Sequence, residues 1–298
     1  MPEQINDERI GESFDYLFKI IDQMNQSGTD DDGVIWDFSQ TKTLNPFFLL
    51  PLSLYRLTCN KSIVYSNIPN ELARYFNMIW FDRFLEAETV KDFATFMARY
   101  KERSYIPMIK FPANASKDAI KNGILGVIGD IIRVQLSIKG DLYIAMRYML
   151  SELIDNITEH SGSEYGYIFA QYYPCKKYID ICIADTGITL LGSYRKTNSL
   201  GIDNDIEAMR QATQGISTKN LPDAENRGYG IVTSKNMLAE GLKGQFLMFS
   251  GGAFYRKTEN EEVVYELPNT IKWNGTIALL RIPYSYNSNF NYINYMED

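Results

Sequence analysis

Three side chains that could do chemistry lie one helical turn apart near the middle of the chain. Glu152, Asn156 and His160 follow one another at intervals of four residues within the segment Met149–Ser163. In a helix this spacing places them in one row along a single face. A carboxylate can serve as a general base, and a carboxamide oxygen is a hard ligand suited to Mg²⁺. The alternative is a half-exposed polar stripe on a structural helix.

A second candidate is an aspartate at the end of an apolar strand. The stretch Ile179–Ala184 leads directly into Asp185, and Gly187 follows two residues later. A carboxylate in this position can accept a hydrogen bond from an exocyclic amine. A glycine beside it lets a flat ring approach the backbone. The alternative is an aspartate that only caps a turn.

Two glycines precede a predicted helix further along the chain. Gly228 and Gly230 come directly before the segment Ile231–Glu240. Glycines at the start of a helix let backbone N–H groups approach an anion, and the helix N-terminus favours negative charge. This arrangement suits a phosphate, although a G-x-G pair alone is also typical of a tight turn.

Hydrophobic spacing predicts the elements that must position these residues. Helices are expected at Asp118–Ile138, Asp141–His160, Asp203–Ala212 and Ile231–Glu240. Strands are expected at Tyr167–Tyr173, Tyr178–Ala184, Gln245–Ser250, Glu262–Glu266 and Thr276–Ile282, with the first two joined as a β-hairpin. The segment Thr213–Asn226 is rich in small polar residues, which indicates a mobile loop ahead of the glycine pair.

The N-terminal part of the chain is predicted to form a smaller α/β unit without a catalytic motif. Helical spacing is found at Ile10–Met24, Leu49–Leu57, Asn70–Ala87 and Thr89–Arg103, and short strands at Gly33–Phe38 and Ser62–Tyr65. The unit ends near Pro107–Pro112. We therefore expect domains at residues 1–112 and 113–284, followed by a polar tail at 285–298. The first domain is predicted to be regulatory or partner-binding.

Composition narrows the class of protein. The chain has 298 residues and a net charge of -7, which argues against a nucleic-acid phosphate surface. Its cysteines, Cys59, Cys175 and Cys182, form no CxxC pair and are typical of reduced residues in a cytosolic protein without a structural zinc site. The polar N-terminus is not a signal peptide, and the apolar runs are too short to cross a membrane. A cytoplasmic protein is expected.

Together, the motifs resemble the ATP-binding domain of the gyrase, heat-shock chaperone, histidine kinase and mismatch-repair superfamily, the GHKL ATPases with the Bergerat fold. The N-box helix, DxG box, glycine box after a mobile lid and late Gly-Thr of that family correspond here to Glu152–Asn156, Asp185–Gly187, Arg227–Gly230 and Gly275–Thr276. The match covers about residues 141 to 282. It implies an α/β fold: a two-layer sandwich of a mixed, mainly antiparallel sheet with helices on one face, here preceded by the smaller N-terminal domain.

The resemblance also implies a ligand, Mg²⁺ with ATP, and roles for individual residues. Asn156 is expected to coordinate Mg²⁺, and Asp185 to read the adenine amino group. Gly187 is expected to shape the adenine pocket, and Thr276 to support the Asp185 end through its hydroxyl.

The remaining expected roles concern the phosphates. Gly228 and Gly230 are expected to hold them beneath the Thr213–Asn226 lid. Lys219 either reaches a terminal phosphate or is an exposed lysine. The sequence departs from the family pattern at Thr189, where a second glycine is usual.

Two classes of function remain open. The only histidine of the chain is His160, inside the predicted ATP helix, so the chain is not a self-contained histidine autokinase. The arrangement is more similar to the compact anti-sigma-factor serine kinases, in which a glutamate at the position of Glu152 acts as base toward a partner's hydroxyl. We expect either an ATPase or a protein serine/threonine kinase acting on a partner protein, or an ATP-gated interaction module with little turnover. Homo-oligomerisation stays open.

Overall fold

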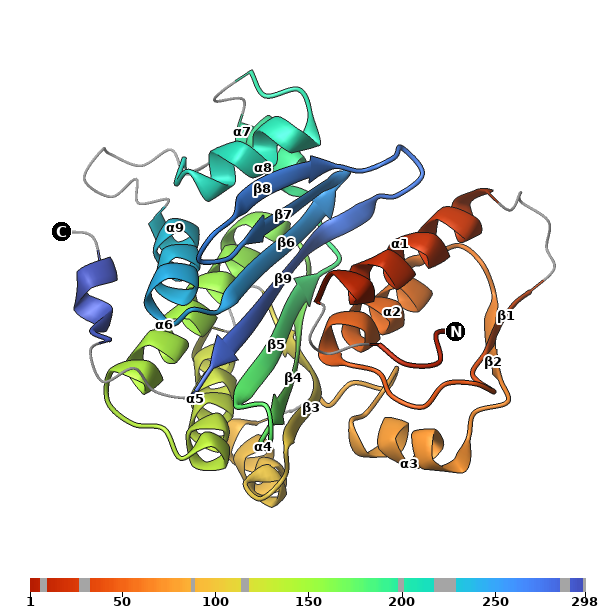
Figure 1. Cartoon of the computed structure of the whole chain (residues 1–298), viewed down its shortest axis with the longest axis horizontal. Coiled ribbons are helices and arrows are strands. Elements are labelled where there is room, and N and C mark those ends of the chain that lie inside the picture. The colour runs from red at the N-terminus through yellow and green to blue at the C-terminus, as the bar shows by residue number, and fades with distance from the viewer. Residues whose placement is uncertain are drawn as a thin grey trace.

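The computed structural model describes residues 1–5, 10–26, 33–86, 89–113, 118–197, 201–216, 229–284 and 290–296, and shows an α/β protein. Within these residues a seven-stranded sheet runs through the middle of the molecule in the order β3-β4-β5-β9-β6-β7-β8 (Figure 1). Every neighbouring pair in it is antiparallel. The strands are β3 (Tyr105–Pro112), β4 (Tyr165–Tyr173), β5 (Tyr178–Asp185), β6 (Gln245–Gly251), β7 (Ala253–Lys257), β8 (Glu262–Glu266) and β9 (Trp273–Pro283).

One face of this sheet is covered by helices that follow β3 along the chain. These are α5 (Asp118–Leu136), α6 (Asp141–Asn156), α7 (Leu190–Thr197), α8 (Asp205–Thr213) and α9 (Tyr229–Asn236). α6 packs between α5 and α9, and α7 packs on α8. The β4–β5 hairpin and the positions of α5, α6, α8 and α9 agree with the sequence prediction to within a few residues at each end, where helices fray and are hardest to delimit.

The second face of the sheet is covered by α1 (Ile10–Gln26) and α2 (Pro46–Thr58). The Phe14 ring of α1 lies 4.6 Å from that of Phe254 in β7, and the Phe18 ring lies 5.1 Å from that of Phe249 in β6. The sequence had predicted helices on one face only. The difference arises because the central strands are apolar on both faces, and both faces must be buried.

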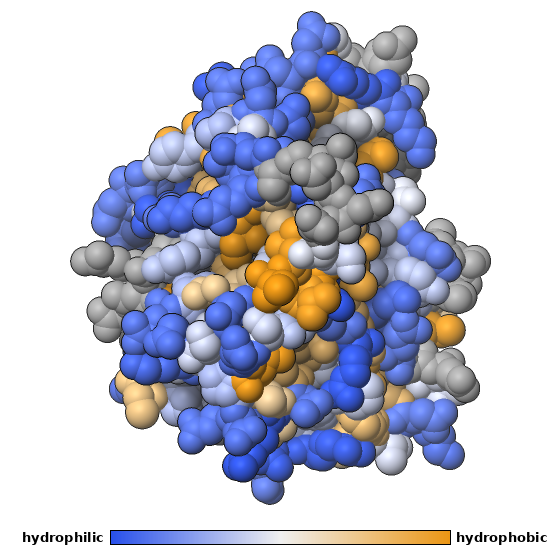
Figure 2. All heavy atoms as spheres, turned by 90° about the vertical axis from the view of Figure 1, so that its right-hand side faces the viewer, coloured by the Kyte–Doolittle hydropathy of each residue, from blue (hydrophilic) through white to orange (hydrophobic). Residues whose placement is uncertain are grey.

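The rest of the N-terminal segment forms a small layer beside α2. Its parallel strands β1 (Val34–Asp37) and β2 (Ile63–Ser66) are followed by the helices α3 (Asn70–Met78) and α4 (Val90–Met97), with a 3-10 turn at Ala98–Tyr100. Ile35 and Val64, paired across β1 and β2, are 66% and 55% exposed. Figure 2 faces this side of the molecule, and apolar side chains gather in the middle of its surface.

Several elements differ from the sequence prediction, among them α7, which was not predicted, and α3, which ends well before Ala87. No strand was predicted at the end of the N-terminal unit, but Tyr105–Pro112 form β3, which pairs with β4 at the edge of the large sheet. β7 had been assigned to no element. The long helix expected at Asp141–His160 is α6 followed by a π-helical turn at Ile157–Ser161, and α9 likewise continues into a π-helical turn at Met237–Gly241. A 3-10 turn at Tyr292–Tyr295 packs against α6 and the second π-turn.

No helix in the described part of the chain is long and apolar enough to cross a membrane.

Candidate functional site

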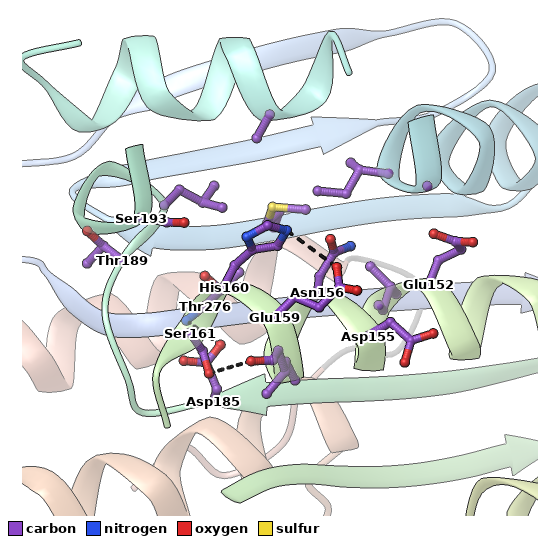
Figure 3. A pocket seen from close by; sticks show the side chains of 18 of the residues that line it. Glu152, Asp155, Asn156, Glu159, His160, Ser161, Asp185, Thr189, Ser193 and Thr276 are labelled. Carbon is purple, nitrogen blue, oxygen red and sulfur yellow. Dashed lines mark hydrogen bonds and ion pairs between the residues drawn. The ribbon is translucent and has the colours of Figure 1, made fainter. Parts of the chain in front are cut away.

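A cavity of about 310 Å³ lies between the sheet and the helices α6, α7 and α9. Five of the residues predicted from the sequence line it: Glu152, Asn156, Asp185, Gly230 and Thr276. Figure 3 shows the labelled side chains of α6 and its π-turn on one side of the cavity and those of Asp185 and Thr276 at its end. Two other predicted residues, Gly228 and Lys219, lie outside the described residues, as does most of the Thr213–Asn226 lid.

The base of the cavity is an apolar layer of the sheet. Ile183, Ala278 and Met248 lie side by side in the register of β5, β9 and β6, and all three line the cavity. Because side chains on a strand alternate between faces, Asp185 at the end of β5 points to the same side as Ile183. A flat apolar ligand could rest on this layer beside a carboxyl group.

Asp185 is the most deeply buried polar residue of the site, with 1% of its surface exposed. The Gly187 N–H donates to its Oδ1 at 2.9 Å, and the Thr276 N–H donates to its Oδ2 at 3.2 Å. Burial raises the pKa of the Asp185 carboxyl to about 7, although these two hydrogen bonds lower it. The carboxyl group is therefore fixed in orientation and is poised between its two protonation states near neutral pH.

Thr276 supports Asp185 in a different way from the one the resemblance implied. The link to Asp185 is made by the Thr276 backbone N–H, whereas its hydroxyl donates to Ser250 Oγ at 3.2 Å. Ser250 was not singled out from the sequence, because a lone serine in an apolar strand carries no spacing signal. That Ser250 of β6 lies opposite Thr276 of β9 becomes apparent only from the strand register.

Gly187 packs directly against the π-turn that follows α6. A Cβ at this position would collide with the Ser161 carbonyl, and the next residue, Ile188, donates its N–H to the same carbonyl at 2.7 Å. The glycine is thus needed for close backbone packing, which joins the Asp185 turn to the π-helical turn at the end of α6. Thr189, where the family pattern has a glycine, accepts a hydrogen bond at its Oγ1 from the Gly192 N–H (3.0 Å) and caps the first turn of α7.

The row of Glu152, Asn156 and His160 faces the cavity, as the helical spacing predicted (Figure 3). Within the described part of the chain, the Asn156 Nδ2 is buried and has no hydrogen-bond partner. A buried amide without a partner is costly in free energy, so this group is a candidate for contact with a ligand. The His160 Nε2 lies 3.7 Å from the Glu159 carboxylate.

Asp155 is not part of this row, but its hydrogen bonds hold α6 in one rotation about the helix axis. Its Oδ1 accepts from the Nζ of Lys121 on α5 at 2.7 Å, and Lys121 itself is 4% exposed. Ser151, one turn earlier on α6, donates to the other Asp155 oxygen at 3.2 Å. These bonds favour the orientation of α6 in which Asn156 points into the cavity.

Glu152 lies against the first turn of α9. A Cβ at Gly230 would collide with the Glu152 carboxylate, which shows how closely the two approach. The cavity therefore has a carboxylate beside the N-terminal end of α9. Favourable interaction with the helix dipole holds an anionic group at such a position.

The described residues contain no cluster of three or more His, Cys, Asp or Glu side chains that could hold a metal ion. A metal ion bound at this site would be coordinated by one protein oxygen, by water and by a second ligand.

Comparisons with known proteins returned no relatives: no protein-family model matches this chain, and no curated protein matches it.

Proposed function

We propose that this protein binds ATP with Mg²⁺ in the cavity at Asp185, as a member of the GHKL type. We further propose that the large sheet and the helices α5, α6 and α9 form a Bergerat-type two-layer sandwich. The N-terminal segment then adds α1 and α2 to the second face. The observation that carries the proposal is the buried Asp185 carboxyl, held by two backbone N–H groups beside an apolar layer of the sheet.

The Asp185 end suits an adenine ring. Ile183, Met248 and Ala278 offer an apolar surface to the ring, and the Asp185 carboxyl can accept a hydrogen bond from its exocyclic amine. A guanine ring presents a carbonyl at the equivalent position, which would leave the buried carboxyl without a donor. Sites that depend on such a bond discriminate strongly against ligands that lack it.

The Asn156 end suits phosphates and a metal. The Asn156 amide has a buried Nδ2 that lacks a partner, and its Oδ1 is of the ligand type that Mg²⁺ prefers. Mg²⁺ commonly takes only one or two protein ligands and completes its shell with phosphate oxygens and water, so a site with a single protein oxygen fits it. When bound, the ion would neutralise phosphate charge. Gly228, Gly230 and Lys219 are the proposed phosphate contacts.

Glu152 is the proposed general base, acting on a hydroxyl group of a partner protein or on water. Phosphoryl transfer depends mainly on positioning and charge neutralisation, so a single base at the phosphate end is sufficient. The exposed Ile35 and Val64 support the N-terminal segment as the partner-binding part. The three unpaired cysteines are consistent with the cytoplasm as the proposed location.

The contact between Glu152 and Gly230 favours a second candidate function. A carboxylate seated at the start of α9 stabilises that helix whether or not any turnover occurs. The protein would then be an ATP-gated interaction module.

Turnover of labelled ATP by Glu152→Gln separates the two functions. The substitution keeps the shape of the side chain but removes its basicity, so it should leave ATP affinity near that of the wild type and lower turnover roughly 10²-fold or more. Glu159→Gln, on the same wall of the cavity, is the matched control and should keep turnover. Tight ATP binding without measurable turnover in the wild type would favour the interaction module.

Metal binding is tested by Asn156→Ala. Loss of a metal ligand should weaken binding of ATP in the presence of Mg²⁺ more than binding in EDTA. Equal losses in the two conditions would remove Asn156 from the metal site.

A further inference from the structure

Ser250 uses the whole hydrogen-bonding capacity of its hydroxyl at the Asp185 end of the cavity. It lies in β6 opposite Thr276 of β9 and is 2% exposed. The hydroxyl donates to the Gly275 carbonyl at 2.7 Å, and it accepts from the Leu190 N–H at 2.9 Å and from the Thr276 hydroxyl at 3.2 Å. A serine hydroxyl has one proton to donate and two lone pairs, so nothing is left over for a ligand.

Two of the three partners of Ser250 contact Asp185, and the third begins α7. Thr276 donates its backbone N–H to the Asp185 carboxyl. Gly275 has a φ of 97°, and its backbone lies so close to Asp185 that a Cβ would collide with the aspartate. Leu190 is the first residue of α7 and lines the cavity. Ser250 thus ties β9, whose Thr276 N–H bonds Asp185, to α7 at this end of the cavity.

The bond to Leu190 also satisfies an N–H that α7 cannot satisfy itself. The first N–H groups of a helix have no partner within the helix. Here the partner comes from the sheet, from a residue 60 positions away along the chain. The start of α7 is therefore anchored to the same hydroxyl that orients Gly275 and Thr276.

We propose that Ser250 is a positioning residue for nucleobase recognition: through Thr276, Gly275 and Leu190 it holds the Asp185 carboxyl and the cavity wall in the geometry that reads the adenine amine. It acts through its neighbours without touching the ligand. The effect of Ser250 on nucleotide preference rests on the proposed function. Its effect on the pKa of Asp185 can be measured without any nucleotide.

Ser250→Ala leaves a carbonyl, a hydroxyl and an N–H without their partner, and it loosens the Thr276 N–H that stabilises the charged Asp185 carboxylate. The pKa of Asp185 should therefore rise. The other titratable side chains that line the cavity are Glu152, Asp155, Glu159, His160 and Tyr194.

The first measurement is the titration of the Asp185 carboxyl carbon by NMR in ligand-free protein. Ser250→Ala should raise its midpoint by roughly half a pKa unit or more, because a hydrogen bond to the charged form is weakened. Ser234→Ala is the matched control: Ser234 is also fully buried, and its hydroxyl has no partner in the described part of the structure. It should leave the Asp185 midpoint in place. Ser250→Thr, which keeps the hydroxyl, should restore the wild-type midpoint.

The second measurement is the ratio of affinities for ATP and inosine triphosphate, in which a carbonyl replaces the amine. Ser250→Ala should reduce the preference for ATP about fivefold or more, the scale of one hydrogen bond. Should Ser250→Ala fail to fold, Thr276→Val removes only the hydroxyl side of the link and should change both readouts in the same direction.

An unchanged Asp185 midpoint together with an unchanged ATP preference in folded Ser250→Ala would overturn the proposal. A wild-type protein that binds no ATP, combined with a raised midpoint in Ser250→Ala, would refute the proposed function and leave the positioning of Asp185 by Ser250 supported.

Discussion

Strand β5 carries two buried aspartates on opposite faces of the sheet, and their partners differ. Asp180 is 0% exposed and faces α2, where both its oxygens bond the Arg281 guanidinium at 2.7 and 2.6 Å. The guanidinium in turn lies 4.0 Å from the Tyr178 ring and 5.7 Å from the Phe47 ring. Asp185, five residues on, faces the cavity and is bonded by two backbone N–H groups, with no cation beside it among the described residues.

The comparison separates a structural carboxylate from one that is available for binding. The charge of Asp180 is neutralised and its oxygens are occupied, so it joins β5 to β9 within the sheet. Among the described residues no side chain neutralises the charge of Asp185, and burial makes that charge costly. A ligand that donates a hydrogen bond to Asp185 would offset part of this cost, which is why we propose nucleobase recognition at this end of the strand.

The largest expected effect is the loss of stability when the buried Asp180–Arg281 pair is broken. Arg281→Met leaves Asp180 buried without its partner and should lower the free energy of unfolding by about 3–5 kcal/mol. Asp185→Asn, measured at pH 8, removes an unpaired buried charge and should cost far less or even stabilise the protein. Denaturant unfolding compares the two. Arg256→Met, which removes the partly exposed pair with Glu261, is the control and should cost about 1 kcal/mol or less. Similar losses of unfolding free energy for Arg281→Met and Asp185→Asn would contradict the distinction between a structural Asp180 and an Asp185 that is available for binding.

The next effect is on ligand affinity. Asp185→Asn should weaken ATP binding by about 1–3 kcal/mol, the scale of a charge-assisted hydrogen bond. Asp130→Asn changes an exposed aspartate on α5 and should leave the affinity as it is. Calorimetric titration of both variants provides the measurement, and an Asp185→Asn protein with wild-type affinity would assign Asp185 to the turn alone.

The smallest effect is a pH dependence of stability. The folded state keeps the proton on Asp185 up to about pH 7, whereas the unfolded state loses it near 3.8. Between these values the folded state binds more protons, so the stabilisation is present at low pH and is lost as pH rises through 7. The loss should be on the order of 1–2 kcal/mol between pH 5 and 7. Unfolding curves of the wild type and Asp185→Asn should therefore converge at pH 5 and separate at pH 8. If the difference in stability between the two proteins stays constant from pH 5 to pH 8, the raised pKa of Asp185 is contradicted.

Local patterns were sufficient to predict much of the cavity. The four-residue row on α6, the aspartate at the end of β5 and the glycine at the start of α9 each depend on a few neighbouring residues, and the structure brings all three together. Glu152, Asn156, Asp185 and Gly230 all line the same cavity.

Features that depend on distant residues were not predictable in the same way. The Asp180–Arg281 pair and the Ser250 hydroxyl join residues that are adjacent only once β5, β6 and β9 are in register. No strand was predicted at β3, which contains Pro107; it lies at a sheet edge and its register shifts between Ile106 and Ile109. An edge strand with such an irregularity tolerates a residue that lacks an N–H. α2 likewise contains Pro51 in its interior and begins three residues before the predicted Leu49.

The central claim is that the carboxyl group of Asp185 reads the amine of an adenine nucleotide, and the most direct test is a calorimetric titration of the wild-type protein with ATP and with GTP in the presence of Mg²⁺. The account predicts binding of ATP and a much weaker or undetectable interaction with GTP. Equal affinity for the two nucleotides, or no binding of ATP, would contradict it.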